Sequence, residues 1–209
     1  GIGSDSFRPR WLAWLSEELL DQFAKLLMVI EREGRWPDLV STLLIAQIPK
    51  SDGGRRPIGL LPTLVRVWEK VRRPIMEQWR QQVHRSYNFA AKGKSSSTAA
   101  WLQAHHAEVA VCRGGHSAAG LVDLTKAFEM VRLELVWWAR LRLHCPPVIL
   151  RLELEAFAFS RRLTMLAAVT EPVQTLSAIL AGGGFATDAL FLVMSGVCDK
   201  VLIEHPSTE

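Results

Sequence analysis

Asp123 is the residue whose position in this sequence most strongly suggests chemistry. It follows a short apolar run, residues 120–122, that predicts a β-strand, and a helix is expected from about 126 to 141. A carboxylate at the end of a strand can hold a divalent metal ion when other oxygen ligands converge on it. The same position also suits a helix N-cap, so the local sequence leaves both roles open.

A second group of candidate residues is cationic. Residues 39–48 and 56–60 predict two strands, and the Ser-Asp-Gly-Gly sequence at 51–54 predicts a tight turn between them. The resulting hairpin places Lys50, Arg55 and Arg56 around its tip. Ammonium and guanidinium groups suit phosphate oxygens, and a solvated turn is the alternative.

The charge of the chain is concentrated in its middle. The 209 residues carry a net charge of +4, but residues 50–94 hold 11 Lys and Arg against 3 Asp and Glu, which leaves −4 for the rest. Such a stretch favours a polyanionic partner, although a solvated helix face explains it equally well. A hydrophobic content of 49% indicates a folded globular chain.

Nothing in the sequence predicts a membrane span or a disulfide framework. The most apolar region, residues 173–197, is interrupted by Asp188 and three consecutive glycines. The three cysteines are isolated, without a paired spacing that would hold zinc. We therefore expect an intracellular protein without a membrane partner, in either nucleus or cytoplasm.

The remaining elements alternate between helices and strands. Helices are expected over 11–31, where Gly34 provides the stop, over 64–79, over 148–159 and from about 185 to 203, with a strand over 163–169. Pro74 should kink or break the second helix. A basic loop at 92–98 precedes another helix, and it lacks the glycine at position 88 that a nucleotide P-loop requires. This alternation predicts a mixed α and β fold.

Four blocks in this order resemble the reverse transcriptases of non-LTR (LINE-type) retrotransposons, over residues 36 to about 205. Residues 48–50 (IPK), 56–61 (RPIGLL) and 68–70 (WEK) resemble the fingers block, and 89–96 (FAAKGKSS) resembles the next block. Residues 121–128 (LVDLTKAF) resemble the palm block that holds the first catalytic aspartate. Residues 179–185 (ILAGGGF) resemble a divergent glycine-centred block of the nucleotide pocket.

The resemblance implies an α+β fold: a fragment of a right-hand polymerase with a basic fingers hairpin, a partial palm sheet and flanking helices. It divides the chain into an N-terminal helical segment at 1–35, a fingers-like region at 36–118 and a partial palm at 119–209. The implied activity is that of an RNA-directed DNA polymerase, which extends a DNA primer on an RNA template with dNTPs and two Mg²⁺ ions.

The resemblance also assigns roles to individual residues. Asp123 would be a catalytic Mg²⁺ ligand, and the backbone carbonyl of Leu124 a further one. Phe128 would be an aromatic gate that excludes a 2′-hydroxyl, with packing under its own helix as the alternative. The remaining nucleotide-binding residues would be Lys50 and Arg56, which contact the triphosphate, and Ala181 and Gly182. The basic stretch 50–94 would face the template–primer backbone.

The sequence departs from the family pattern in three places. Glu129 replaces an aspartate, and Leu180-Ala181-Gly182 replaces Pro-Gln-Gly, which removes an amide side chain. The Asp-Asp hairpin and the thumb do not occur within the 209 residues. We expect Asp188 and Asp199 to be helix-surface or polar-core residues that do not replace that pair.

A single carboxylate cannot hold two metal ions, so we expect the isolated chain to be inactive. The alternative function is a non-catalytic nucleic-acid-binding relic of a decayed retroelement. A third option, an unrelated metal-dependent phosphotransferase, needs ligands near Asp123. Glu129 and Glu134 do not stand at a recognised ligand spacing.

Overall fold

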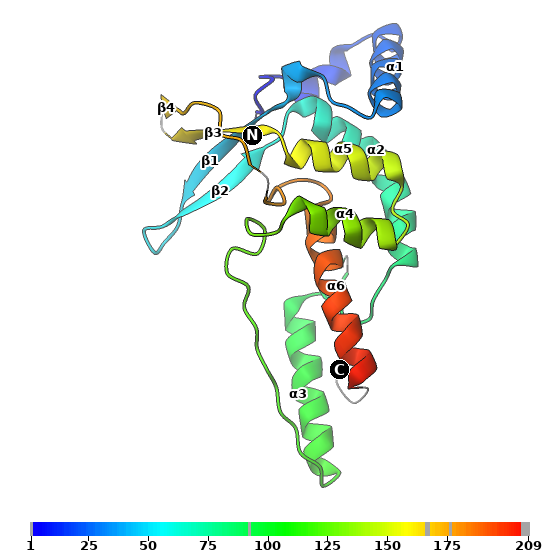
Figure 1. Ribbon diagram of the computed structural model, residues 1–209, viewed down its shortest axis with the longest axis vertical. Helices are drawn as coiled ribbons and strands as arrows, with labels where there is room; N and C mark the ends of the chain where they lie inside the picture. The colour runs from blue at the N-terminus through cyan, green and yellow to red at the C-terminus, as the bar shows by residue number, and fades with distance from the viewer. Residues whose placement is uncertain (1, 92, 166–167, 176, 206–209) are drawn as a thin grey trace.

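The computed structural model describes residues 2–91, 93–165, 168–175 and 177–205. It is a mixed α and β fold in which a small sheet lies at one end of a helical body (Figure 1). The elements, in chain order, are η1 (Pro9–Trp14), α1 (Glu17–Glu33), η2 (Asp38–Val40), β1 (Thr42–Pro49), β2 (Arg55–Leu60), α2 (Thr63–Gln82), α3 (Ser96–Cys112), α4 (Leu133–Arg142), α5 (Pro147–Phe157), β3 (Ser160–Met165), β4 (Ala168–Val169) and α6 (Ala186–Glu204). The predicted mixed α and β class is confirmed.

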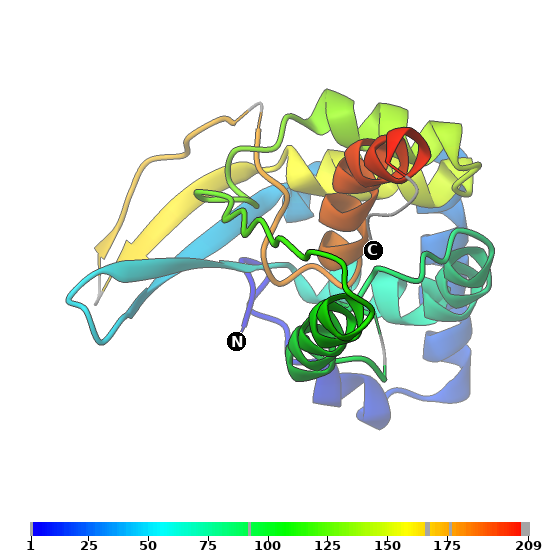
Figure 2. The ribbon, with the colours of Figure 1, turned by 90° about the horizontal axis from the view of Figure 1, so that it is seen from below.

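The sheet has four described strands in the order β2-β1-β3-β4, with β1 at its centre. β1 pairs antiparallel with β2 and parallel with β3, from Thr42 opposite Ser160 to Ala46 opposite Thr164. Seen from below, the β1–β2 hairpin extends away from the helices (Figure 2). The predicted turn at its tip is confirmed, since the Lys50 N–H donates to the Gly54 carbonyl at 2.8 Å.

The helices keep most of their predicted positions. The first prediction, 11–31, is two elements, because Ser16 caps the start of α1 by accepting a hydrogen bond from the Leu19 N–H at 3.4 Å. Gly34 ends α1 in the left-handed conformation (φ 63°), as predicted. α2 runs through Pro74 without a break. Lys70 and Pro74 are both exposed, so water can satisfy the carbonyl that proline leaves unpaired.

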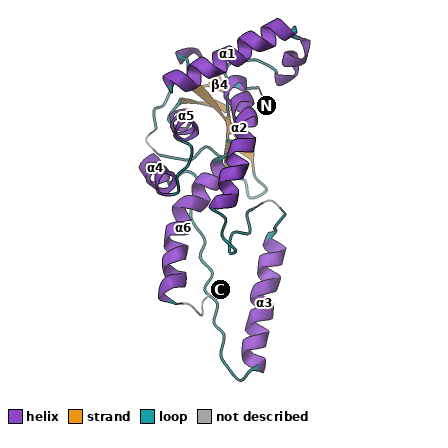
Figure 3. Cartoon of the chain, turned by 90° about the vertical axis from the view of Figure 1, so that its right-hand side faces the viewer, coloured by secondary structure: helices purple, strands orange, loops and turns teal. Residues whose placement is uncertain are grey.

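The predictions for residues 120–141 are partly wrong. Residues 115–124 contain no helix or strand, 125–129 form turns, and the helix begins at Leu133 rather than near 126. Residues 120–122 have the apolar pattern of a strand, but no described strand pairs with them. This segment and α3, which has no buried residue, project from the body (Figures 1 and 3). We call α3 and residues 113–124 the arm.

One hydrophobic core joins the rest of the chain. It includes residues from all three predicted segments, such as Leu27, Trp68 and Phe185, and the division into those segments stays a prediction. The buried Trp79 donates its indole N–H to the Leu143 carbonyl at 2.8 Å, which ties α2 to the end of α4. None of the described helices has the length and apolar character needed to cross a membrane.

Candidate functional site

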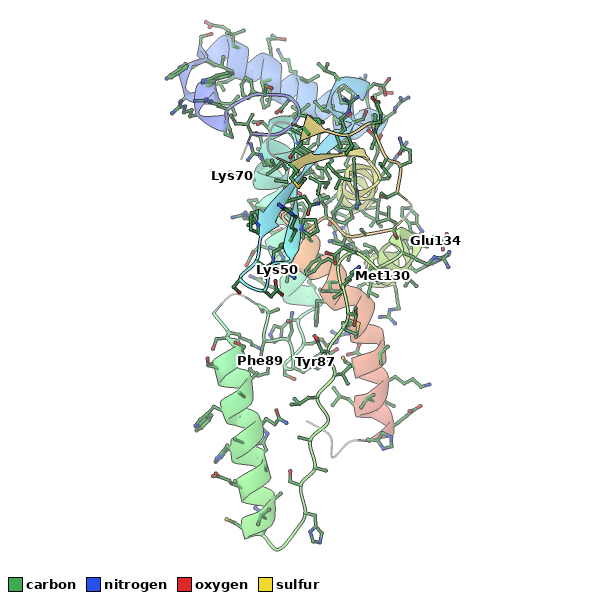
Figure 4. The ribbon with its side chains drawn as sticks, turned by 90° about the vertical axis from the view of Figure 1, so that its left-hand side faces the viewer. Lys50, Lys70, Tyr87, Phe89, Met130 and Glu134 are labelled. Atoms are coloured by element: carbon green, nitrogen blue, oxygen red, sulfur yellow. The ribbon has the colours of Figure 1, made fainter. Side chains whose placement is uncertain are left out.

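The tip of the β1–β2 hairpin brings together the two cations predicted to bind phosphate. Lys50 and Arg56 both line a hollow of about 390 Å³ at the tip. Asp52 lies in the same hollow, and its Oδ1 accepts a hydrogen bond from the Gly54 N–H at 2.9 Å, which fixes the turn. Figure 4 shows Lys50 at this end of the hairpin. Arg55 is exposed but does not line the hollow.

A second pocket, of about 220 Å³, lies between the hairpin and the loop before α6. We call it the Phe128 pocket. Phe128 and Ala181, which the sequence assigns to two different blocks, both line it. Its other lining residues come from the hairpin, the turn at 125–129, β3 and the loop: Ile45, Pro57, Gly59, Glu129, Arg161, Leu163, Val173, Thr175, Ala178, Ile179 and Leu180. Phe128 lies in a turn rather than in a helix, and its half-buried side chain packs against the hydrophobic core. Its role as a gate stays a prediction.

Backbone hydrogen bonds hold the two sides of the Phe128 pocket together. The Ile179 N–H donates to the Phe128 carbonyl, and the Ala178 N–H donates to the Val131 carbonyl, both at 2.8 Å. The glycines allow the loop to approach the hairpin. A Cβ on Gly59 would lie 2.8 Å from a Leu180 methyl carbon, and one on Gly182 (φ 111°) would lie 3.2 Å from the Gly59 carbonyl oxygen.

Arg161 is a pocket residue that the sequence analysis missed. Its Nη2 donates to the carbonyls of Phe157 and Ala178 at 3.1 and 3.3 Å, and burial lowers its pKa. Its Nε and the Thr175 hydroxyl are buried without a hydrogen-bond partner among the described residues. Buried polar atoms normally have a hydrogen-bond partner, so these two atoms are exceptions close to the pocket. The sequence contained one indication of this residue: Arg161 and Arg162 stand directly before the apolar strand predicted over 163–169.

Asp123 lies in the arm and does not line the Phe128 pocket. It is exposed in the arm, between Val122, which is 87% exposed, and Leu124, which is 42% exposed. Its alternative role as a helix N-cap is wrong, because Arg132 is the N-cap residue of α4. Within the described residues no group of three His, Cys, Asp or Glu side chains could hold a metal ion. The metal role of Asp123 and Leu124 stays a prediction.

The other two aspartates of interest are held by basic residues. Asp188 pairs with Arg80, whose Nε donates to it at 2.8 Å. Asp199 pairs with Arg85 at 3.0 Å and accepts a hydrogen bond from the Tyr87 hydroxyl at 2.5 Å. Arg85 holds the pKa of Asp199 below its usual value. Both aspartates therefore anchor α6 to α2 and to the loop that follows α2.

Several of the cations in the basic stretch 50–94 are engaged in contacts within the protein. Arg72 pairs with Glu31, and Arg80 and Arg85 pair with aspartates of α6. Lys94 donates to the Ser86 carbonyl at 2.7 Å and lies over the Phe89 ring. Lys92 lies outside the described residues. The exposed cations of this stretch are those of the hairpin tip together with Lys70 and Arg73.

The chain matches no protein-family model and no curated protein. The interpretation of the site therefore depends on its geometry and on the resemblance of the four sequence blocks.

Proposed function

We propose that this chain is the fingers and first part of the palm of an RNA-directed DNA polymerase of the non-LTR retrotransposon type. In this proposal the Phe128 pocket receives the sugar and base of an incoming dNTP, and the hairpin tip contacts its phosphates. The parent enzyme would extend a DNA primer on an RNA template.

The observation that carries the proposal is the convergence of three sequence blocks on one pocket. Gly59 comes from the fingers block, Phe128 from the palm block and Ala181 from the glycine-centred block, yet all three line the Phe128 pocket. The pocket is mostly apolar with a few polar groups, as binding sites for small organic ligands are. Its aromatic ring suits the flat face of a sugar or base.

The described residues do not form the Mg²⁺ site that catalysis requires. Mg²⁺ needs several oxygen ligands in octahedral geometry, Asp123 is exposed in the arm, and the described residues contain no group of three His, Cys, Asp or Glu side chains that could hold a metal ion. We therefore propose no catalytic step for this chain. With Mg²⁺, dNTPs and a primed RNA template, the isolated chain should incorporate no nucleotide; robust incorporation would contradict this.

Two neighbouring arginines provide the test of nucleotide binding. Arg56 lines the hollow at the hairpin tip and Arg55 does not, because successive side chains of a strand point to opposite faces. Arg56→Ala should weaken binding of a fluorescent dATP analogue about tenfold, as expected for a lost charge-assisted hydrogen bond. Arg55→Ala is the matched control and should leave the affinity within about twofold. Equal losses would indicate diffuse attraction, and no binding by the wild type would overturn the proposal.

A nucleic-acid-binding module without chemistry is the second candidate function. The exposure of Asp123 in the arm favours it, because a relic needs no assembled metal site. Such a module would bind a primed RNA template through the cations of the hairpin, and its affinity would fall steeply with salt. Template binding without any binding of dATP would support this candidate over the first.

A further inference from the structure

Glu69 is a buried carboxylate that lies directly against the glycine loop, residues 182–184. It belongs to α2 and is 8% exposed. Its Oε1 accepts a hydrogen bond from the Gly184 N–H at 3.0 Å. A Cβ on Gly184 would lie 3.1 Å from the Glu69 Oε2, closer than an ordinary van der Waals contact, so glycine lets the loop approach the carboxyl group.

Arg140 holds the next residue of the same segment from another helix. It belongs to α4, is fully buried, and its Nη2 donates to the Phe185 carbonyl at 3.1 Å and to the Glu153 carboxylate of α5 at 2.8 Å. Thus a carboxylate takes the N–H of Gly184 and a guanidinium meets the carbonyl of Phe185. Two consecutive residues, Gly184 and Phe185, are therefore each held by a hydrogen bond to a buried side chain.

Two cations on its own helix, Arg73 and Arg66, act on the Glu69 carboxylate. Glu69 also acts on the buried Glu153 of α5, as do three further charged groups: Arg140 of α4, Asp188 of α6 and Arg80 of α2. Burial raises the pKa of Glu69 to about 7, and the Gly184 N–H, Arg73 and Arg66 oppose that rise. Burial also raises the pKa of Glu153, against the effect of Arg140.

We propose that Glu69 is a positioning residue that holds the glycine loop, through Gly184, in the shape that closes the Phe128 pocket. Ala181, just before the glycines, lines that pocket, so a shift of the loop would change the pocket directly. The proposal rests on the proposed function only for the identity of the ligand, since the contact of Glu69 with the loop is independent of it.

The pH dependence of the loop distinguishes positioning from simple packing. When the loop opens, water reaches Glu69 and its pKa should return toward 4.5 from about 7. The closed loop therefore binds the proton more tightly. The closed loop is therefore most stable below the pKa of Glu69 in the open state, and this stability is lost as the pH rises through the pKa of the closed state.

The experiment is hydrogen exchange of the full chain, measured on millisecond and longer timescales for the peptide 181–186. The protection factor of this peptide should fall more than about tenfold from about pH 5 to 8 in the wild type. Glu69→Gln keeps an acceptor for Gly184 but cannot titrate, so its protection factor should not change with pH. Glu69→Leu should lower protection at every pH.

Glu155→Gln is the matched control. Glu155 also accepts a backbone N–H, that of Trp36 at 2.9 Å, and burial raises its pKa, but the bond is made to another part of the chain. This variant should leave the 181–186 peptide unchanged. The same pH dependence in Glu69→Gln as in the wild type would overturn the proposal, even if Glu69→Leu does not fold.

Binding of the fluorescent dATP analogue by the same variants separates the two proposals. If Glu69→Leu loosens the loop and weakens binding, both are supported. If the loop responds as expected but the wild type binds no nucleotide, the positioning role stands and the proposed function fails. If protection of the 181–186 peptide changes neither with pH nor in Glu69→Leu, the positioning role fails, whether or not the chain binds the dATP analogue.

Discussion

The Phe128 pocket and the arm each contain a short apolar run, but the run at the pocket is buried and the run in the arm is exposed. Ile179 and Leu180 at the pocket are 2% and 3% exposed, whereas Leu121 and Val122 in the arm are 90% and 87% exposed. At the pocket, the backbone N–H of Ile179 has a partner in the Phe128 carbonyl at 2.8 Å. In the arm, residues 120–122 have no described strand beside them.

An apolar run is therefore buried only where another part of the chain lies beside it. A lone strand leaves its backbone groups to water and its side chains without neighbours, so it has little reason to form. We therefore expect substitutions at the pocket to change stability strongly and the same substitutions in the arm to change it little.

The largest expected effect is at Arg140. Arg140→Met removes the partner of the buried Glu153 and should lower the free energy of unfolding by about 3–5 kcal/mol. The matched variant Arg113→Met, at an exposed residue of the arm, should change it by less than about 0.5 kcal/mol. Urea denaturation measures both. Replacing Arg140 and Glu153 together by Met should recover most of the lost stability. If it does not, the loss in Arg140→Met does not come from leaving Glu153 buried without its partner.

A second pair of variants compares two leucines. Leu180→Ala should lower the free energy of unfolding by about 2–5 kcal/mol, because it opens a cavity between the loop and the hairpin. Leu121→Ala should change it by less than about 0.5 kcal/mol. Thermal unfolding followed by circular dichroism is sufficient, and similar losses at both sites would remove the distinction between pocket and arm.

The smallest expected effect is at Asp199, where α6 holds the loop that leads into the arm. Because Arg85 lowers the pKa of Asp199, the pair should stabilise the protein above pH 3.8 and lose that contribution as pH falls through the lowered value. Asp199→Asn should cost about 1 kcal/mol at neutral pH. In acid the difference from the wild type should vanish. A difference that grows in acid would reverse the assigned sign.

The sequence predicted what local chemistry determines. Gly34 ended a helix in the left-handed conformation, and the turn at 51–54 formed the expected hairpin. Gly59 and Phe128 lay in recognisable blocks, and the structure places them around one pocket. These features depend on residues near one another in sequence or on a motif.

The sequence could not predict features that depend on distant partners. Nothing in α4 indicates that Arg140 faces inward, because its partners Glu153 and Phe185 lie on other elements. Arg161 was missed because β3 begins at Ser160, before the predicted start at 163. The strand at 120–122 was predicted from its pattern, and whether a strand forms there depends on a neighbour that the pattern does not specify.

The central claim is that the Phe128 pocket, rather than the arm, receives a nucleotide. The most direct measurement is an NMR titration of the chain with dATP, observed at the backbone amides. We expect shifts at Gly59, Phe128, Ala181 and Gly182 that saturate together, with Leu121 and Val122 unchanged. Shifts confined to the arm, or no shift at the pocket under saturating dATP, would contradict it.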